Sequence, residues 1–148
     1  MMDRIKRLLT PKTPAEQSMP PYVAVTALLV EAALVDGVYV NIESDMIAEI
    51  LVEAFEFEAD KADALLSEAE ALAEEAVGSH QFTKHAKKLP MAERVKVIEA
   101  IYRVIYADGE RSDLEDAYVR HVSGLLHVDD VHRAEARRRA EARASGTA

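Results

Sequence analysis

The sequence predicts an all-α protein, a compact bundle of about six to eight helices that contains two pseudo-repeated helical hairpins. Three observations lead to this prediction. A chain of 148 residues has the length of one ordinary domain. It holds 25 alanines and 30% charged residues but only five glycines and five prolines, and this composition is typical of packed helices. Apolar residues also recur along most of the chain with the period of an α-helix.

Prolines interrupt the first part of the chain, so residues 1–20 are predicted to be an N-terminal arm or linker and residues 21–144 the helical domain. Proline is tolerated in the first turn of a helix, and the first helix is therefore expected over residues 21–35. Thr26 and Glu31 are its only strongly polar residues. A helix that is apolar nearly all round belongs in the middle of a bundle.

Helical spacing and turn residues predict the later elements in the same way. Helices are expected over residues 42–55, 59–77, 80–89, 91–107, 112–125 and 130–144. In the helix over 91–107, the apolar side is expected to face the core and Lys96, Glu99 and Arg103 to face solvent. Glu99 and Arg103 have the spacing of a favourable i,i+4 ion pair. The next helix is expected to begin with a capping box from Ser112 to Glu115.

Two of the predicted hairpins are similar to each other. A shift of 72 residues places Asp36 on Asp108 and Glu43 on Glu115, and it preserves the apolar register of the helices on either side. Because the turn, the following acid and both registers coincide, we interpret the pattern as an internal duplication.

The acidic residues are concentrated in one half of the chain. The whole protein has a formal charge of −9, but residues 21–77 contain 14 acids and the single base Lys61, while the remainder is net basic. Such a half attracts cations and basic partners and repels nucleic acid. Glu70, Glu74 and Glu75 are the predicted partner-binding residues. The simpler interpretation is a solvated helix face that keeps the protein soluble.

Several classes of function find no support in the residues. The chain has no cysteine, which excludes disulfides, thiolate metal sites and thiol redox chemistry. Its longest apolar window, residues 22–35, is shorter than the roughly 20 residues of a membrane span. The basic first residues are interpreted as a frayed surface turn rather than as a peripheral membrane contact. Five arginines fall between residues 133 and 143 without aromatic neighbours, which favours a solvated or partner-binding helix over nucleic-acid binding.

The candidate functional motif is Asp-Gly followed by a glutamate after five residues, and it occurs twice. Its carboxylates are Asp36 and Glu43 in the first copy, and Asp108 and Glu115 in the second. Neither copy has the oxygen ligands of the first half of an EF-hand loop, so single-loop calcium binding is excluded. The four carboxylates are instead predicted to hold one hard cation together, or one cation at each pair, with Mg²⁺, Ca²⁺ or Mn²⁺ preferred.

A purely structural interpretation of these turns stands beside the metal site. Aspartate and glycine are ordinary turn residues, and Glu115 is also explained by its capping box. Against this interpretation, aspartate is disfavoured at the negative end of the helix dipole, and the chain places it there twice, at Asp36 and Asp108.

The chain resembles the TerB-like family, named for tellurite resistance. The resemblance covers roughly residues 22–140 and rests on Ala27-Leu28-Leu29 running to Asp36-Gly37 with Glu43, on Phe82-Thr83, on Ala107-Asp108-Gly109-Glu110 with Glu115-Asp116, and on Arg120 with Leu125-Leu126-His127-Val128. It implies an all-helical fold with two pseudo-repeated hairpins, a cytoplasmic location, no enzymatic activity, divalent metal at the acidic turns and action within larger complexes.

The resulting prediction is a non-enzymatic, cytoplasmic TerB-like module of a tellurite or chemical-stress response. It is expected to bind a divalent cation, protein partners or both through its acidic surface. The alternative is a metal-free adaptor that docks a basic partner on residues 43–75, and a third interpretation is metal-assisted hydrolysis by a buried carboxylate group. Without thiols, the chain is not expected to reduce tellurite itself.

Overall fold

The computed structural model describes residues 19–35, 41–107 and 113–146, apart from the side chains of residues 41–43 and 113. All regular secondary structure in these ranges is helical, which confirms the predicted class. The helices are α3 (Pro21–Leu34), α4 (Asn41–Phe55), α5 (Ala59–Glu75), α6 (His80–Ala86), α7 (Met91–Tyr106), α8 (Asp113–Leu125) and α9 (Asp130–Ala144). Their bounds differ from the predicted ones by at most three residues.

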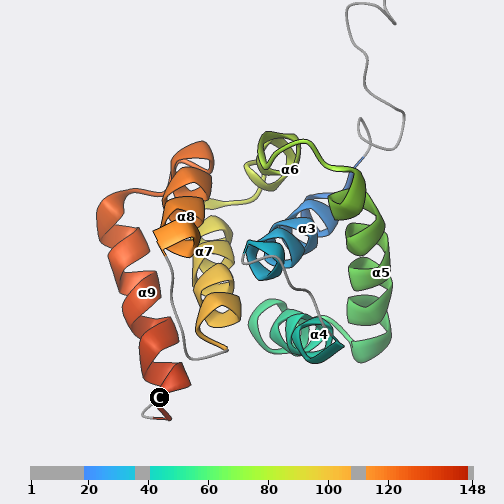
Figure 1. Ribbon diagram of the computed structural model, residues 1–148, viewed down its shortest axis with the longest axis horizontal. Coiled ribbons are helices and arrows are strands. Elements are labelled where there is room, and N and C mark those ends of the chain that lie inside the picture. Colours follow the sequence, from blue (N-terminus) through green and yellow to red (C-terminus); the bar gives the residue numbers. More distant parts are fainter. Residues whose placement is uncertain (1–18, 36–40, 108–112, 147–148) are drawn as a thin grey trace, which may run out of the picture.

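Helix α3 lies at the centre of the bundle, as its apolar sequence predicts. It contacts α4, α5, α6 and α7, which surround it in Figure 1. Every residue from Val23 to Val30 is buried, and so are Ala32 and Ala33. Thr26 is buried with them because its hydroxyl donates a hydrogen bond of 2.7 Å to the carbonyl oxygen of Tyr22. The one charged side chain, Glu31, is only partly exposed.

The corner between α4 and α5 is closed by an aromatic cluster at the beginning of α3. The Tyr22 ring makes edge-to-face contacts with Phe55 and Phe57, at centroid distances of 5.7 and 5.1 Å. Between the two phenylalanines, Glu56 adopts a positive φ of 60°, which turns the chain sharply. Helix α5 then packs its apolar side on α3 and leaves its acidic side outside.

The end of α8 is a capped turn in which His127 has a positive φ of 57°. The amide of Val128 donates to the carbonyl oxygen of Ser123 at 2.9 Å, which is the longer bond of a Schellman motif. The guanidinium of Arg94 in α7 donates to the carbonyl oxygens of Leu126 and Leu89, at 2.8 and 3.0 Å. The end of α8 is therefore fastened to the beginning of α7.

Helix α9 covers part of the solvent face predicted for α7: Lys96 is exposed as predicted, whereas Glu99 and Arg103 are half-buried. The two helices pack along each other through Ala136 and Ala140, both buried, whose small side chains allow a close approach. Glu99 then pairs with Arg139 of α9 rather than with Arg103, which is ion-paired to Glu53 of α4 at 2.8 Å. Arg138, Arg139 and Arg143 of α9 are exposed, and the buried stripe of this helix consists of alanines alone.

Candidate functional site

The structure describes only one of the four predicted metal ligands completely. Asp36 and Asp108 lie outside the described residues, as does the side chain of Glu43, whose backbone belongs to the first turn of α4. Glu115 lies in the first turn of α8 and is 6% exposed. Among the described residues, no group of three or more His, Asp or Glu side chains has the arrangement of a metal site. The four-carboxylate site therefore stays a prediction.

Tyr118, one turn after Glu115, joins α8 to α3. Its hydroxyl oxygen lies 2.8 Å from the carbonyl oxygen of Leu28 and 3.1 Å from Oε1 of Glu31. Residues at positions i and i+3 share one face of a helix. Glu115 is thus on the side of α8 that faces the end of α3, where Val35 is the last described residue before Asp36.

The carboxyl group of Glu31 is the centre of a polar cluster that the motif analysis missed. Its Oε1 accepts a hydrogen bond of 2.8 Å from the Ser79 hydroxyl in addition to its contact with Tyr118. Ser79 is at the N-cap of α6, yet its side chain makes no capping bond there. A serine at this position ordinarily accepts a hydrogen bond from a helix amide. In this structure the Ser79 hydroxyl instead makes a tertiary contact with Glu31.

Burial raises the pKa of Glu31 above its ordinary range, and the hydrogen bonds from Ser79 and Tyr118, together with the charge of His121, offset only part of this effect. Burial and the neighbouring carboxyl group raise the pKa of Tyr118 well above 10. The Tyr118 hydroxyl has one proton but lies within reach of two acceptors. The Leu28 carbonyl and the Glu31 carboxyl group therefore share the single proton of this hydroxyl.

A cavity of about 280 Å³ lies over this cluster. Glu31, Ser79 and Tyr118 supply its polar wall, and its apolar wall comes from Leu34, Val35 and Ala73. The sequence contains a signal that points here, since Glu31 is the only charged residue in an otherwise apolar helix. Its two partners are 48 and 87 residues away and no spacing rule connects them to it.

A second cavity, of about 270 Å³, separates α4 from the ends of α7 and α9. Met46, Ile50, Arg103, Tyr106 and Arg143 are among the residues that line it. Its charges are matched internally: the hydrogen bond from Arg103 and its positive charge hold the pKa of Glu53 below the ordinary range, and Arg143 lies 3.8 Å from the same carboxylate. Arg103 and Arg143 on the wall of this cavity are thus both paired with Glu53.

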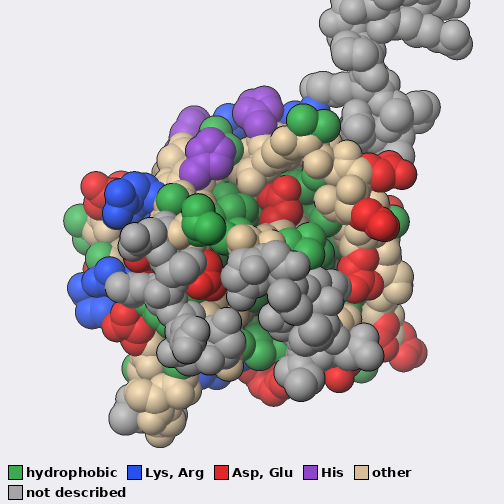
Figure 2. Space-filling model, viewed as in Figure 1, with side chains coloured by type: hydrophobic (Ala, Val, Ile, Leu, Met, Phe, Trp, Pro, Cys, Tyr) green, Lys and Arg blue, Asp and Glu red, His purple; other side chains and the backbone are tan. Residues whose placement is uncertain are grey.

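The predicted partner-binding residues lie on the outer side of α5. Glu74 and Glu75 are exposed, Glu70 is half-buried, and none of the three forms an ion pair within the described parts of the chain. Figure 2 shows acidic side chains gathered along the edge where α5 lies and basic ones on the opposite side of the molecule. The structure thus groups these three glutamates on one helix and separates them from the net basic end.

No helix in the described part of the chain is both long and apolar enough to cross a membrane.

Comparison with known proteins identifies the family of the chain. Neither the curated proteins nor the solved structures contain a significant match to the chain. A family model described as tellurite resistance protein TerB matches residues 22–138, which is most of the chain and nearly the segment over which the resemblance was noted. The chain therefore belongs to the TerB family.

Proposed function

We propose that this TerB protein is a non-enzymatic module of a cytoplasmic response to tellurite or related chemical stress. It binds a divalent cation at its acidic corners and protein partners through its acidic surface. The observation that carries the cation proposal is the contact of Tyr118 with Leu28 and Glu31, because it holds the first turn of α8 against the end of α3. Glu115, the glutamate of the second motif, is in that first turn, and α3 ends just before the first motif in the sequence.

The proposal treats the corner between α7 and α8 in the same way, with the beginning of α4 beside the end of α7. Ala107, the last described residue before Asp108, lines a cavity with Met46, which is one turn beyond Glu43. The shift of 72 residues relates this cavity to the one over Glu31, since it places Met46 on Tyr118 and Val35 on Ala107. This correspondence supports the internal duplication and a crossed arrangement in which each hairpin contributes to both corners.

In the proposed arrangement, Asp36 pairs with Glu115 and Asp108 with Glu43. Each pair offers carboxylate oxygens only, which suit Mg²⁺, Ca²⁺ or Mn²⁺ better than Zn²⁺. Two carboxylates per ion leave coordination positions for water or for an oxygen atom from a partner. The burial of Glu115 limits the access of bulk water to its side of the site, and an ion bound there is screened less by solvent.

The test is a titration of the full chain with Mg²⁺, Ca²⁺, Mn²⁺ and Zn²⁺ while amide NMR signals are recorded. The proposal expects saturable shifts near Gly37 and Gly109 with one of the three hard ions at millimolar concentration or below. Asp36→Asn combined with Glu115→Gln is expected to abolish the shifts near Gly37 and to spare those near Gly109. Glu58→Gln, on an exposed side chain elsewhere, serves as the control.

If no ion shifts these signals at millimolar concentration, the cation proposal is wrong and the metal-free adaptor replaces it. The unpaired glutamates of α5 favour that second function. Reversing the charge of Glu70, Glu74 and Glu75 to lysine is expected to disrupt partner binding and to leave ion binding at the corners intact. The opposite result, a loss of ion binding with partner binding intact, would contradict the assignment of these three glutamates to partner binding.

A further inference from the structure

We propose that the cavity over Glu31 is a binding pocket for an arginine or lysine side chain of a basic partner protein. This inference deepens the proposed partner binding and rests on it, but it places the recognition at a specific carboxyl group instead of on the α5 surface in general. The pocket lies beside the corner that contains Glu115, but none of its described lining residues is one of the four predicted metal ligands.

Two hydroxyl groups hold the carboxyl group of Glu31 in one orientation. The Ser79 hydroxyl, 2.8 Å away, and the Tyr118 hydroxyl, 3.1 Å away, both contact Oε1 of Glu31 and thereby fix its orientation. Within the described residues, the other oxygen, Oε2, has no hydrogen-bond partner, and no lysine or arginine is paired with this carboxyl group. A fixed carboxyl group in a cavity wall, with no base paired to it among the described residues, is suited to a ligand that donates N–H bonds.

The cavity has the size and the mixed polar and apolar walls that suit a long basic side chain. Its volume of about 280 Å³ corresponds to the share of about nine water molecules in the liquid, which is enough for the end of a long side chain. Leu34, Val35 and Ala73 form the apolar part of the wall. Lysine and arginine bury their methylene stems against such surfaces while their charged ends make hydrogen bonds.

The cavity suits a basic side chain better than a metal ion or an anion, and the charges around it attract a basic segment. A hard divalent cation needs six or more oxygen ligands or several waters, and this cavity presents a single carboxyl group. An anion is disfavoured by Glu31 itself and by Glu70, which lies one turn from Ala73 at the cavity wall. Exposed Glu74 and Glu75 continue the negative charge along α5, and Lys61 is the only base in residues 21–77. These charges attract a basic segment to the cavity.

The experiment measures binding of a fluorescent, acetylated and amidated octapeptide that contains two arginines spaced by alanines. The full chain is compared with its Glu31→Gln variant, in which the carboxyl group becomes a neutral amide of the same shape. We expect this change to weaken peptide affinity about tenfold or more, because a charge-assisted bond is lost. Replacing the arginines by citrulline, which has the same shape without the charge, is expected to weaken binding to the unmodified protein equally.

The matched control is Glu93→Gln. Glu93 is also half-buried and also accepts a hydrogen bond from a tyrosine, Tyr22, at 2.9 Å, but it lies outside the cavity. This variant is expected to bind the peptide within about twofold of the original protein, as is usual for a surface change away from the site. Thermal unfolding of both variants checks that any loss of binding is not a loss of folding.

The outcomes separate this inference from the wider proposal. If Glu31→Gln binds as well as the original protein while neutralising Glu70, Glu74 and Glu75 weakens binding, the acidic surface is a docking site and the pocket is not. If citrulline peptide binds as tightly as arginine peptide, cation recognition is refuted. If no variant changes an already undetectable affinity, both the pocket and the basic partner are wrong, while the cation titration at the corners remains unaffected.

Discussion

The Tyr118 hydroxyl lies 2.8 Å from the carbonyl oxygen of Leu28, a residue 90 positions earlier in the sequence. A carbonyl in a helix that already accepts its own i→i+4 bond can accept a second hydrogen bond, and this one comes from another helix. The contact fixes the position of α8 along α3. It therefore determines which side chains of the two hairpins lie at the same end of the bundle.

Removing this hydroxyl is expected to destabilise the protein. Tyr118→Phe keeps the ring but leaves the buried Glu31 carboxyl group and the Leu28 carbonyl without the bond, so the free energy of unfolding should fall by about 1–2 kcal/mol. Tyr106→Phe is the control, because the Tyr106 hydroxyl bonds an exposed carboxylate, that of Glu141, and should cost less than about 0.5 kcal/mol. Equal losses in urea unfolding would contradict the special role of Tyr118.

The raised pKa of Glu31 predicts how stability depends on pH. A carboxyl group that binds its proton more tightly in the folded state contributes stability below its unfolded pKa, near about 4.3, and loses that contribution as pH rises through the folded pKa. Glu31→Gln imitates the neutral form at every pH. We therefore expect the variant to gain stability relative to the original protein between about pH 4 and pH 7.

Urea unfolding of both proteins across this range measures the difference. The other titrating groups are common to both chains and cancel in the comparison. A difference that moves the opposite way, with the original protein gaining on the variant as pH rises, would show that Glu31 is ionised and stabilised by its neighbours instead.

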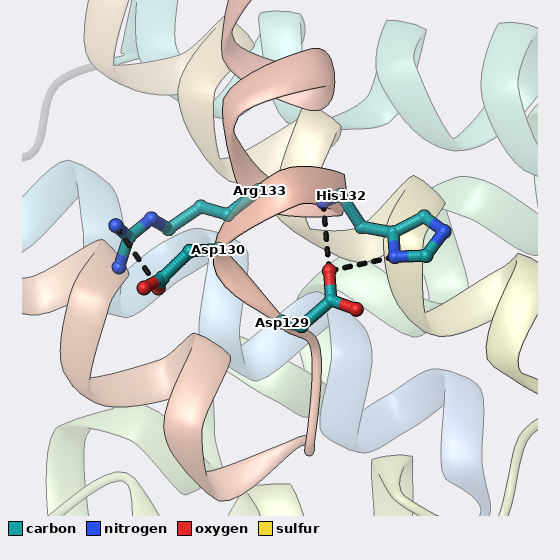
Figure 3. A network of polar contacts seen from close by, with 4 residues as sticks. All are labelled: Asp129, Asp130, His132 and Arg133. Carbon is teal, nitrogen blue, oxygen red and sulfur yellow. Dashed lines mark hydrogen bonds and ion pairs between the residues drawn. The ribbon is translucent and has the colours of Figure 1, made fainter.

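The third prediction concerns the N-terminal end of α9 and how readily its backbone hydrogen bonds open to solvent. Figure 3 shows the Asp129 carboxylate, whose Oδ1 accepts from the backbone amide of His132 at 2.8 Å and lies 2.7 Å from its ring Nδ1. Beside it, Asp130 and Arg133 form an ion pair at 3.3 Å. The hydrogen bonds from the His132 backbone and ring lower the pKa of Asp129. The stabilisation from this cap is therefore fully present at pH values above the pKa of Asp129 in the unfolded chain. It is lost as the pH falls through the lower pKa of the folded state.

Asp129→Ala is expected to increase amide hydrogen exchange in the first turns of α9 several-fold at neutral pH, because helix amides lose their acceptor. Asp129→Asn keeps a capping oxygen and is expected to retain most of the protection while removing its dependence on acid. Exchange in α3, at the centre of the bundle, is the internal control. Unchanged protection in the alanine variant would show that packing alone holds this end of α9.

The close packing of α7 and α9 gives a fourth prediction. Ala136 is completely buried in that contact, so Ala136→Leu should destabilise the protein by about 1–3 kcal/mol through overpacking. Ala144→Leu, at the exposed end of the same helix, should change stability by less than about 0.5 kcal/mol. Thermal unfolding measures both. Similar effects of the two substitutions would indicate that α9 packs loosely.

Much of the secondary structure follows from local patterns. The apolar run of α3 predicted a central helix, and all ten of its buried residues agree with that position. The ends of the helices were predicted within three residues because proline, glycine and aspartate interrupt the helical period. The face of α9 was less predictable. An alanine stripe has little hydrophobic signal, so the sequence alone does not reveal that it covers α7.

The candidate site was predictable only in part. A carboxylate in an apolar helix marks Glu31 as unusual, but Ser79 and Tyr118 have ordinary local roles in the sequence, as a helix cap and as a core residue. The repeated acidic motif drew attention to the corners instead. Of its carboxylates only the side chain of Glu115 lies within the described residues, and so the metal prediction awaits its titration.

Local sequence patterns are enough to establish the helical class, the order of the helices and the acidic character of one half, because these features depend on residues close together along the chain. The tertiary structure alone decided that Glu31 meets Ser79 and Tyr118, that α9 neutralises Glu99 through Arg139, and that a cavity lies above the central carboxyl group. Contacts across 40 or more residues depend on how complementary side chains pack together, and helical periodicity contains no information about that packing.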